Sequence, residues 1–190
     1  MSDLKKMAHD AEIYARKEIE KYGLPSMFHF DLSLQKGLWL AEKMNANPDL
    51  VKAGISFMDL KLGEAFKNGI QKEHVKMSSE ATQEFLSNYD LDENEKEILI
   101  NSVEAHHGST SYNSIEAEIC ANADCYRFVH PKGVFYYFTT LSKRYNDFES
   151  VINQIEVKLN EKNNIVSIPI VKDELSNYYD TLIDYINLCR

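Results

Sequence analysis

The sequence predicts an all-α protein. Only 7 glycines and 4 prolines occur in 190 residues, which leaves few positions for the many tight turns of a β-protein. Most segments repeat apolar residues at spacings of three and four, the period of an amphipathic helix. At this length we expect one domain over residues 1–190.

In the first half of the chain, turn residues and capping patterns mark the ends of the expected helices. Gly23 and Pro25 end the first helix, and Asn47-Pro48, a capping residue followed by proline, opens the third. Gly63 and Gly69 indicate a loop with a short turn before the fourth. The expected helices cover about 2–22, 30–44, 48–58 and 74–88.

Similar signals divide the second half. Asp92 and Glu95 have the spacing of a capping box, with Asp in place of the usual Ser or Thr, and Ser114 can cap the helix after the loop at Gly108. The β-branched run 165–171 is compatible with a short extended segment, although its proline argues against a central strand. The expected helices cover about 93–107, 115–129, 134–145, 147–162 and 172–188.

Composition argues against several classes of protein. With 30 acidic and 21 basic residues, a net charge of -9 is unfavourable for a general nucleic-acid binder. No apolar run approaches the roughly 20 residues that span a bilayer, and the N-terminus lacks the apolar stretch of a signal peptide. The three cysteines fit no zinc or redox spacing. We therefore expect a cytoplasmic protein with reduced thiols and no membrane partner.

Several segments carry a histidine or an aspartate on the side predicted to be buried. Asp59 lies four residues after Ile55, and Asp124 lies four after Cys120. A buried carboxylate is costly without a charge partner, and one cation could satisfy both aspartates. Imidazoles and carboxylates together suit divalent metal ions. The candidate metal ligands are His29, Asp59, His74, His106, His107 and Asp124.

Each candidate also has a structural interpretation. A single histidine on a helix face is more often a hydrogen-bonded core residue. Asp59 could end a helix at the surface, Asp124 could pair with Arg127, and the adjacent His106 and His107 could favour a helix C-terminus. The recurrence of His or Asp over five successive segments favours a shared site.

The order of these residues resembles the HD-domain metal-dependent phosphohydrolase superfamily. The matching features are His29 followed by Leu40-Ala41-Glu42, Asp59 in Phe57-Met58-Asp59-Leu60, His74 with Ser78, His106 or His107, and Ala123-Asp124. The resemblance covers about residues 25–130 and implies an HD-domain-like helical bundle. Residues 131–190 would then form additional C-terminal helices that pack on this core.

The sequence departs from the family pattern at the histidine of the His-Asp pair, which is Met58 here. One metal position would keep His29, Asp59 and Asp124 but lose an imidazole, whereas the second would retain Asp59 with the later histidines. The sequence is compatible with three outcomes: the protein binds one ion instead of two, its first metal position is weakened, or the site no longer catalyses. The lysine that family members often carry three residues after the Asp is also missing, because Leu62 stands there and Lys61 one place earlier.

The resemblance implies a hydrolase of a phosphate ester, either a nucleotide or a small phosphorylated metabolite. A divalent ion (Mn, Fe, Mg, Zn or Ni) would activate a water molecule as the nucleophile. The catalytic candidates are Asp59, which would hold the ion and its water, and His106 and His107, one of which would ligate the ion or steer the leaving oxygen. Candidate phosphate-binding cations are Lys61, Lys67, Lys72, Lys76, Arg127 and Lys132.

Two other classes of function are compatible with the sequence. One is a degenerate HD domain that binds a nucleotide or a partner without chemistry, which Met58 motivates. The other is a purely structural helical module, in which the histidines and aspartates would be dispersed. The apolar, tyrosine-rich face of the last helix is compatible with a homodimer. The expected ligand is a small anionic phosphorylated substrate.

Overall fold

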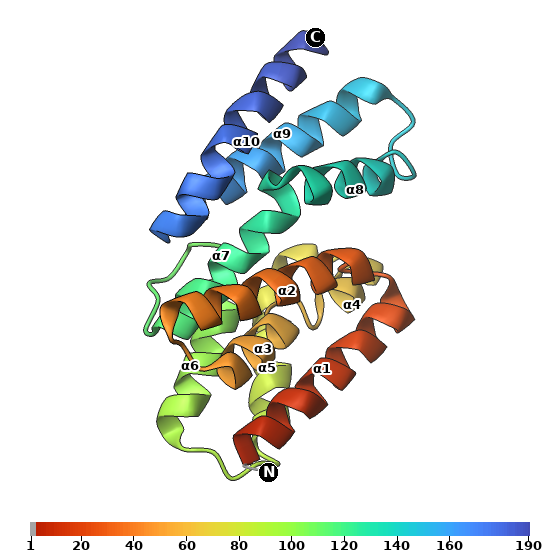
Figure 1. Cartoon of the computed structure of the whole chain (residues 1–190). Helices are drawn as coiled ribbons and strands as arrows, with labels where there is room; N and C mark the ends of the chain where they lie inside the picture. Colours follow the sequence, from red (N-terminus) through yellow and green to blue (C-terminus); the bar gives the residue numbers. More distant parts are fainter. Residues whose placement is uncertain (1–2) are drawn as a thin grey trace.

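The computed structural model describes residues 3–190, and that part of the chain is all-α, as expected (Figure 1). The helices are α1 (Asp3–Tyr22), α2 (Met27–Met44), α3 (Pro48–Met58), α4 (Leu62–Lys67), η1 (Gln71–Glu73), α5 (His74–Leu86), α6 (Glu93–Glu104), α7 (Ile115–Val129), α8 (Pro131–Leu141), α9 (Phe148–Ile165) and α10 (Pro169–Leu188).

The central helix is α3, which packs against α1, α2, α6 and α7. Most of its residues are buried, so its sequence is apolar on nearly every side. Helix α7 approaches it closely through small side chains. A Cβ atom at Gly54 would lie 2.7 Å from Sγ of Cys120, so the glycine permits this approach. The packing places the end of α3, and therefore Asp59, inside the protein.

The C-terminal helices α8, α9 and α10 lie together at one end of the molecule, the upper end in Figure 1. Helix α9 packs on α7, and α10 packs on both. Glu174 of α10 accepts hydrogen bonds from Lys36 of α2 (2.7 Å) and Tyr126 of α7 (2.6 Å). These contacts hold the C-terminal helices over the end of α7 that carries Asp124.

Several helix boundaries differ from those expected. Helix α2 begins at Met27 because the Ser26 hydroxyl accepts a hydrogen bond from the backbone N–H of His29. The expected loop over 63–73 contains α4 and the 3-10 turn η1. Only residues 166–168 separate α9 from α10, because Pro169 opens α10 in its first turn, where proline is favourable. The extended backbone with which the run 165–171 is compatible is thus confined to the connection before Pro169, where Ile168 is extended (φ -74°, ψ 124°).

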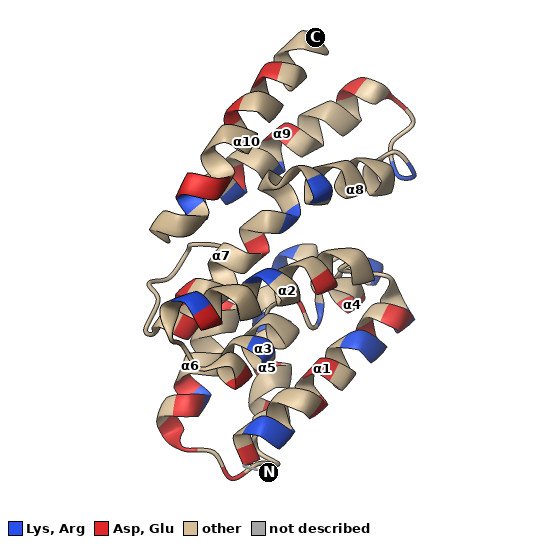
Figure 2. Cartoon of the chain, in the orientation of Figure 1, with Lys and Arg blue, Asp and Glu red and all other residues tan. Residues whose placement is uncertain are grey.

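Acidic and basic residues are interspersed along the helices of the described chain, and the view in Figure 2 shows no continuous basic face. Within residues 3–190, no helix combines the length and the apolarity that crossing a bilayer requires. All three cysteines are free, Cys120 and Cys125 in the core and Cys189 at the surface.

Candidate metal centre and pocket

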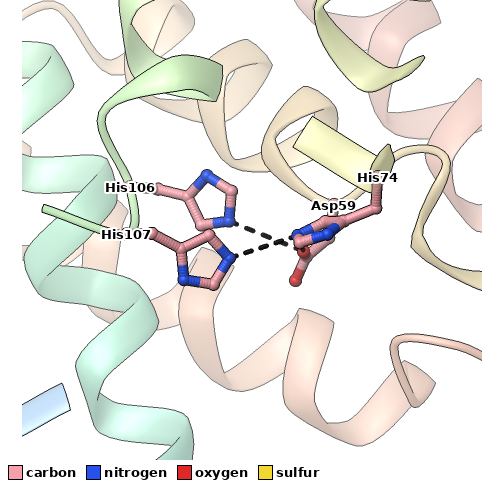
Figure 3. A group of neighbouring side chains, drawn as sticks. All are labelled: Asp59, His74, His106 and His107. Carbon is pink, nitrogen blue, oxygen red and sulfur yellow. Dashed lines mark hydrogen bonds and ion pairs between the residues drawn. The ribbon is translucent and has the colours of Figure 1, made fainter. Parts of the chain in front are cut away.

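Four of the six expected ligands converge on one point (Figure 3). Asp59 caps the C-terminus of α3, His74 opens α5, and His106 and His107 lie in the turn after α6. One possible ligand atom from each residue lies within 4.8 Å of those of the other three. The dispersal that a purely structural module predicts is therefore not observed for these four residues.

The turn after α6 explains why both adjacent histidines face the same point. The sequence predicts a helix to about 107, but α6 ends at Glu104. Gly108 then adopts a φ of +70°, and its N–H donates to the carbonyl oxygen of Ala105 (2.8 Å). Successive side chains diverge on a helix, whereas here the imidazole rings of His106 and His107 lie 4.1 Å apart.

The outer nitrogens of the histidine rings have acceptors that orient the rings. Nδ1 of His74 lies 2.7 Å from the carbonyl oxygen of Gln71, and Nδ1 of His106 lies 2.6 Å from that of Val103. Because a carbonyl only accepts, each Nδ1 is the donor, which leaves the inward-facing Nε2 of each ring as the possible metal-binding atom. Metal-bound histidines are usually oriented by this kind of outer hydrogen bond.

The inner atoms fit a metal ion. Nε2 of His74 and Nε2 of His106 each lie 3.6 Å from Oδ1 of Asp59, and Nε2 of His74 lies 3.1 Å from Nε2 of His107. Tetrahedral ligands at about 2.0–2.1 Å from a metal are separated by about 3.3 Å. Nε2 of His106 is also buried without a hydrogen-bond partner, which is unusual for a polar atom unless something else binds it.

The second oxygen of Asp59 faces a different cation. Nη1 of Arg127 lies 2.5 Å from Oδ2 of Asp59 and 2.6 Å from Oδ1 of Asp124, so one guanidinium nitrogen joins both carboxylates. Nζ of Lys162 lies 2.7 Å from Oδ2 of Asp124. The expected alternative for Asp124, a pair with Arg127, is thus observed, and Lys162 adds a second cation.

This charge pairing keeps both aspartates ionised. Burial by itself favours the neutral acids, but Arg127 and, secondarily, His106 hold the pKa of Asp59 well below its usual range. Burial likewise opposes ionisation of Asp124, but Lys162 and then Arg127 lower its pKa. Both carboxylates are therefore anions at neutral pH, each beside a fixed cation.

His29 lies outside the group of four. It is buried among aromatic rings, and its Nε2 donates to the carbonyl oxygen of Gly133 (3.0 Å), so that nitrogen is not free to bind a metal. Burial, and next the charge of Arg127, lower the pKa of His29 to about 4. His29 and Asp124 were expected as metal ligands, and the structure instead gives each of them partners from the protein.

A pocket of about 170 Å³ opens beside the group. Asp59, His74 and His107 lie on its wall, and Phe128 and Tyr137 add aromatic surface. Its lining also holds four basic residues against two acidic ones, namely Arg127, Arg144, Lys158 and Lys162 against Asp59 and Asp124. Arg127 and Lys162 are paired with those aspartates and Lys158 with Glu161, so among the described residues Arg144 is the lining cation without an ion pair, and its charge favours an anionic ligand.

Three of these cations were not among the candidates, namely Lys158 and Lys162 on α9 and Arg144 in the turn before it. Of the expected phosphate-binding residues, only Arg127 lines the pocket, and Lys61 is instead paired with Glu18 (2.9 Å) and Glu64 (3.1 Å). A signal for Lys162 exists in the sequence. It lies three residues after Leu159 and seven after Ile155, on the buried face of α9. A buried lysine, like a buried aspartate, needs a charge partner, so the reasoning that singled out Asp59 and Asp124 applies to Lys162 as well.

Comparison with known proteins gives distant sequence relatives. The chain is 27% identical over 117 residues to Ribonuclease Y of Fusobacterium nucleatum subsp. nucleatum and 26% identical over 117 residues to Ribonuclease Y of Clostridium novyi. The matched stretch is 62% of this chain and 21% of each relative, so the chain spans about a fifth of their length. No family model matches the sequence.

Solved structures share the fold over nearly the whole chain. A predicted HD-superfamily hydrolase from an uncultured Thermotogales bacterium superposes with a TM-score of 0.68 at 11% identity, covering 94% of this chain and 88% of its own. Bacillus subtilis YpgQ in complex with ADP also gives a TM-score of 0.68, at 16% identity, with coverage of 100% and 95%. The resemblance to the HD superfamily is thus confirmed for the fold.

Proposed function

We propose, from the HD-type fold and the group of Asp59, His74, His106 and His107, that this protein is a metal-dependent hydrolase of a small phosphate ester. The observation that carries the proposal is the orientation of the histidine rings. Their outer nitrogens have acceptors in the protein, and the inner Nε2 atoms meet beside Oδ1 of Asp59. An arrangement that leaves buried lone pairs facing one another is favourable when a cation binds between them.

The pocket beside the group supports a phosphorylated substrate. Arg144 and Lys158 line it on the side of the C-terminal helices and can contact phosphate oxygens. Tyr137 and Phe128 provide apolar walls against which a base or another organic group can pack. We therefore propose a nucleotide or a small phosphorylated metabolite as the substrate class.

Residues of this chain would hold and orient the reacting groups. When bound, a divalent ion activates water near neutral pH and offsets the charge of the phosphate. Asp59 would supply the anionic ligand, and His74 and His106 would each supply a nitrogen ligand through Nε2. Burial lowers the pKa of His107, so this ring is neutral at pH 7 and can ligate through Nε2 or contact the leaving oxygen.

The proposal is tested by Mn²⁺ binding and by hydrolysis of a chromogenic phosphate ester such as bis(p-nitrophenyl) phosphate. We expect bound Mn²⁺, turnover that a chelator removes, and a loss of affinity of about 100-fold or more in the His106→Ala variant. His130→Ala is the matched control, because that histidine packs against Tyr178 and does not line the pocket. Wild-type protein that binds no metal above trace level would refute the proposal.

A second candidate is an HD domain that binds a nucleotide without hydrolysing it. The replacement of the family histidine by Met58, and the arginine between Asp59 and Asp124, are the observations that favour it. ADP binding by calorimetry, combined with no hydrolysis of phosphate esters in the presence of Mn²⁺, would support this candidate. Hydrolysis that Asp59→Ala abolishes in a folded protein would exclude it.

A further inference from the structure

Arg127 lies at the point where the two buried aspartates meet. Its Nη1 contacts Oδ2 of Asp59 and Oδ1 of Asp124 at 2.5 and 2.6 Å, and the exposed fractions of the three side chains are 5%, 9% and 2%. The two hydrogens of one guanidinium nitrogen can each serve one carboxylate, so a single atom bridges the pair. A cation between these aspartates is what the sequence predicts, but the protein itself supplies it.

Each of the four carboxylate oxygens of Asp59 and Asp124 faces either a cationic side chain or the histidines. Oδ2 of Asp124 is bound by Lys162, whose side chain is 1% exposed. Oδ1 of Asp59 faces His74 and His106, while its Oδ2 faces Arg127. Asp59 is therefore the boundary between a group of imidazoles and a group of fixed cations.

The other two expected positions near Arg127 are an apolar side chain and a histidine with one ring nitrogen already bonded. Met58 is 2% exposed and belongs to the apolar core, lining a small cavity with Ile19 and Phe30. Nε2 of His29 donates to the carbonyl of Gly133. A divalent ion between Asp59 and Asp124 would thus find at most Nδ1 of His29 as an imidazole ligand, and it would have to displace a guanidinium that is paired with both aspartates.

Charge balance favours the same conclusion. Asp59 and Asp124 carry two negative charges, and Arg127 and Lys162 carry two positive charges within the same buried group. Adding a dication here would leave an uncompensated charge in a region of low polarity, which is strongly unfavourable. The ion site on the other side of Asp59 borders the pocket, where His74 and His107 are partly exposed, so water or an anionic ligand can offset the charge of an ion bound there.

We infer that Arg127 is a permanent cation that takes the place of a metal ion between Asp59 and Asp124, so that the protein binds one divalent ion, not two, at Asp59, His74, His106 and His107. This inference rests on the proposed metal site. Arg127 is a positioning residue in it, because its contact with Oδ2 fixes the orientation in which Asp59 presents Oδ1 to the histidines. Removing the guanidinium and restoring the imidazole should together create a second ion site.

The test is the number of Mn²⁺ ions bound per chain, measured by calorimetry and by electron paramagnetic resonance, in which two adjacent ions give a spin-coupled signal. We expect one uncoupled ion in the wild type. In the double variant Met58→His with Arg127→Ala we expect two ions and a coupled signal. Arg16→Ala is the matched control, because Arg16 also joins two carboxylates, Glu12 (2.9 Å) and Asp31 (2.8 Å), outside the pocket; it should keep one ion.

The outcomes separate the inference from the proposed function. Two coupled ions in the wild type would overturn the inference while leaving the metal-dependent function in place. No bound ion in the wild type would overturn both. The wild-type measurement is decisive by itself if the double variant does not fold. In that case Arg127→Lys, which keeps a cation near Asp59 and Asp124, is the second variant, and it should still bind one ion.

Discussion

The buried pair between Lys162 and Asp124 provides a sharp test of how the C-terminal helices stabilise the site. Lys162 is on α9 and Asp124 on α7, and their charged atoms are 2.7 Å apart with side chains that are 1% and 2% exposed. The change Lys162→Met removes the cation but keeps a flexible side chain of similar length. It leaves Asp124 ionised in the core with only Arg127 as a partner.

The expected cost follows from this geometry. Breaking a buried ion pair by removing one partner costs about 3–5 kcal/mol, because the remaining charge is left without compensation. Oδ1 of Asp124 still contacts Arg127, so we expect the lower end of that range, about 3 kcal/mol of unfolding free energy. The pKa of Asp124 should also rise, since Lys162 is the largest favourable influence on its ionised form.

The assay is urea denaturation at pH 7, with the free energy of unfolding obtained by linear extrapolation. Lys158→Met is the matched control, because Lys158 precedes Lys162 by one turn of α9 and pairs with Glu161 at 2.7 Å, with a side chain that is 31% exposed. A half-exposed pair of this kind contributes about 1 kcal/mol or less.

The double variant Asp124→Asn with Lys162→Met completes the test. We expect it to lose less stability than the sum of the two single variants, by about 2 kcal/mol, because it leaves no unpaired charge from this pair. If Lys162→Met costs less than about 1 kcal/mol and matches Lys158→Met, the view of Lys162 as a charge partner required by Asp124 is wrong.

Three further predictions concern stability and local geometry. His29 should be neutral in the folded protein, since folding lowers its pKa from 6.5 to about 4. As the pH falls from about 6.5 towards 4, the unfolded chain binds a proton at this residue that the folded protein does not, so the free energy of unfolding should decrease by up to about 3 kcal/mol. This decrease should be smaller in His29→Gln. Gly133→Ala should lower the free energy of unfolding by about 2 kcal/mol or more, because the alanine Cβ would lie 2.5 and 2.6 Å from the carbonyl oxygens of Arg127 and Tyr126. A variant as stable as the wild type in urea unfolding would contradict this close approach. Asp92→Ala should cost about 1 kcal/mol by opening the capping box of α6, without changing Mn²⁺ affinity; a change in affinity would mean that the cap acts on the site.

Most helices were predictable because their signals are local. The periodic apolar residues, the Asn47-Pro48 cap and the capping box at Asp92 act within one or two turns of the chain, so sequence spacing alone locates them. A local signal that suits two structures does not locate an element. The run around Pro169 has an apolar, β-branched composition that suits a strand, yet it opens α10, whose apolar face is buried against α7 and α9.

The site was predictable as a list of residues but not as a set of contacts. A His or Asp on an apolar face indicates that some partner exists, because an unpaired polar group in the core is costly. The pattern does not identify the partner. Asp59 and Arg127 are 68 residues apart, and His29 and Gly133 are 104 apart, so no spacing rule connects them.

The sequence by itself thus determined the helical class, and it indicated that Asp59, Asp124 and several histidines lie on apolar faces where they need partners. Only the tertiary structure decided how each charge is balanced. The packing of α9 on α7 brings Lys162 to Asp124, and the packing of α3 on α7 brings Asp59 to Arg127, which lies three residues after Asp124 on the same helix. The physical reason is that charge pairing in a core depends on distances of a few ångströms between segments far apart in the chain, and those distances are set by packing.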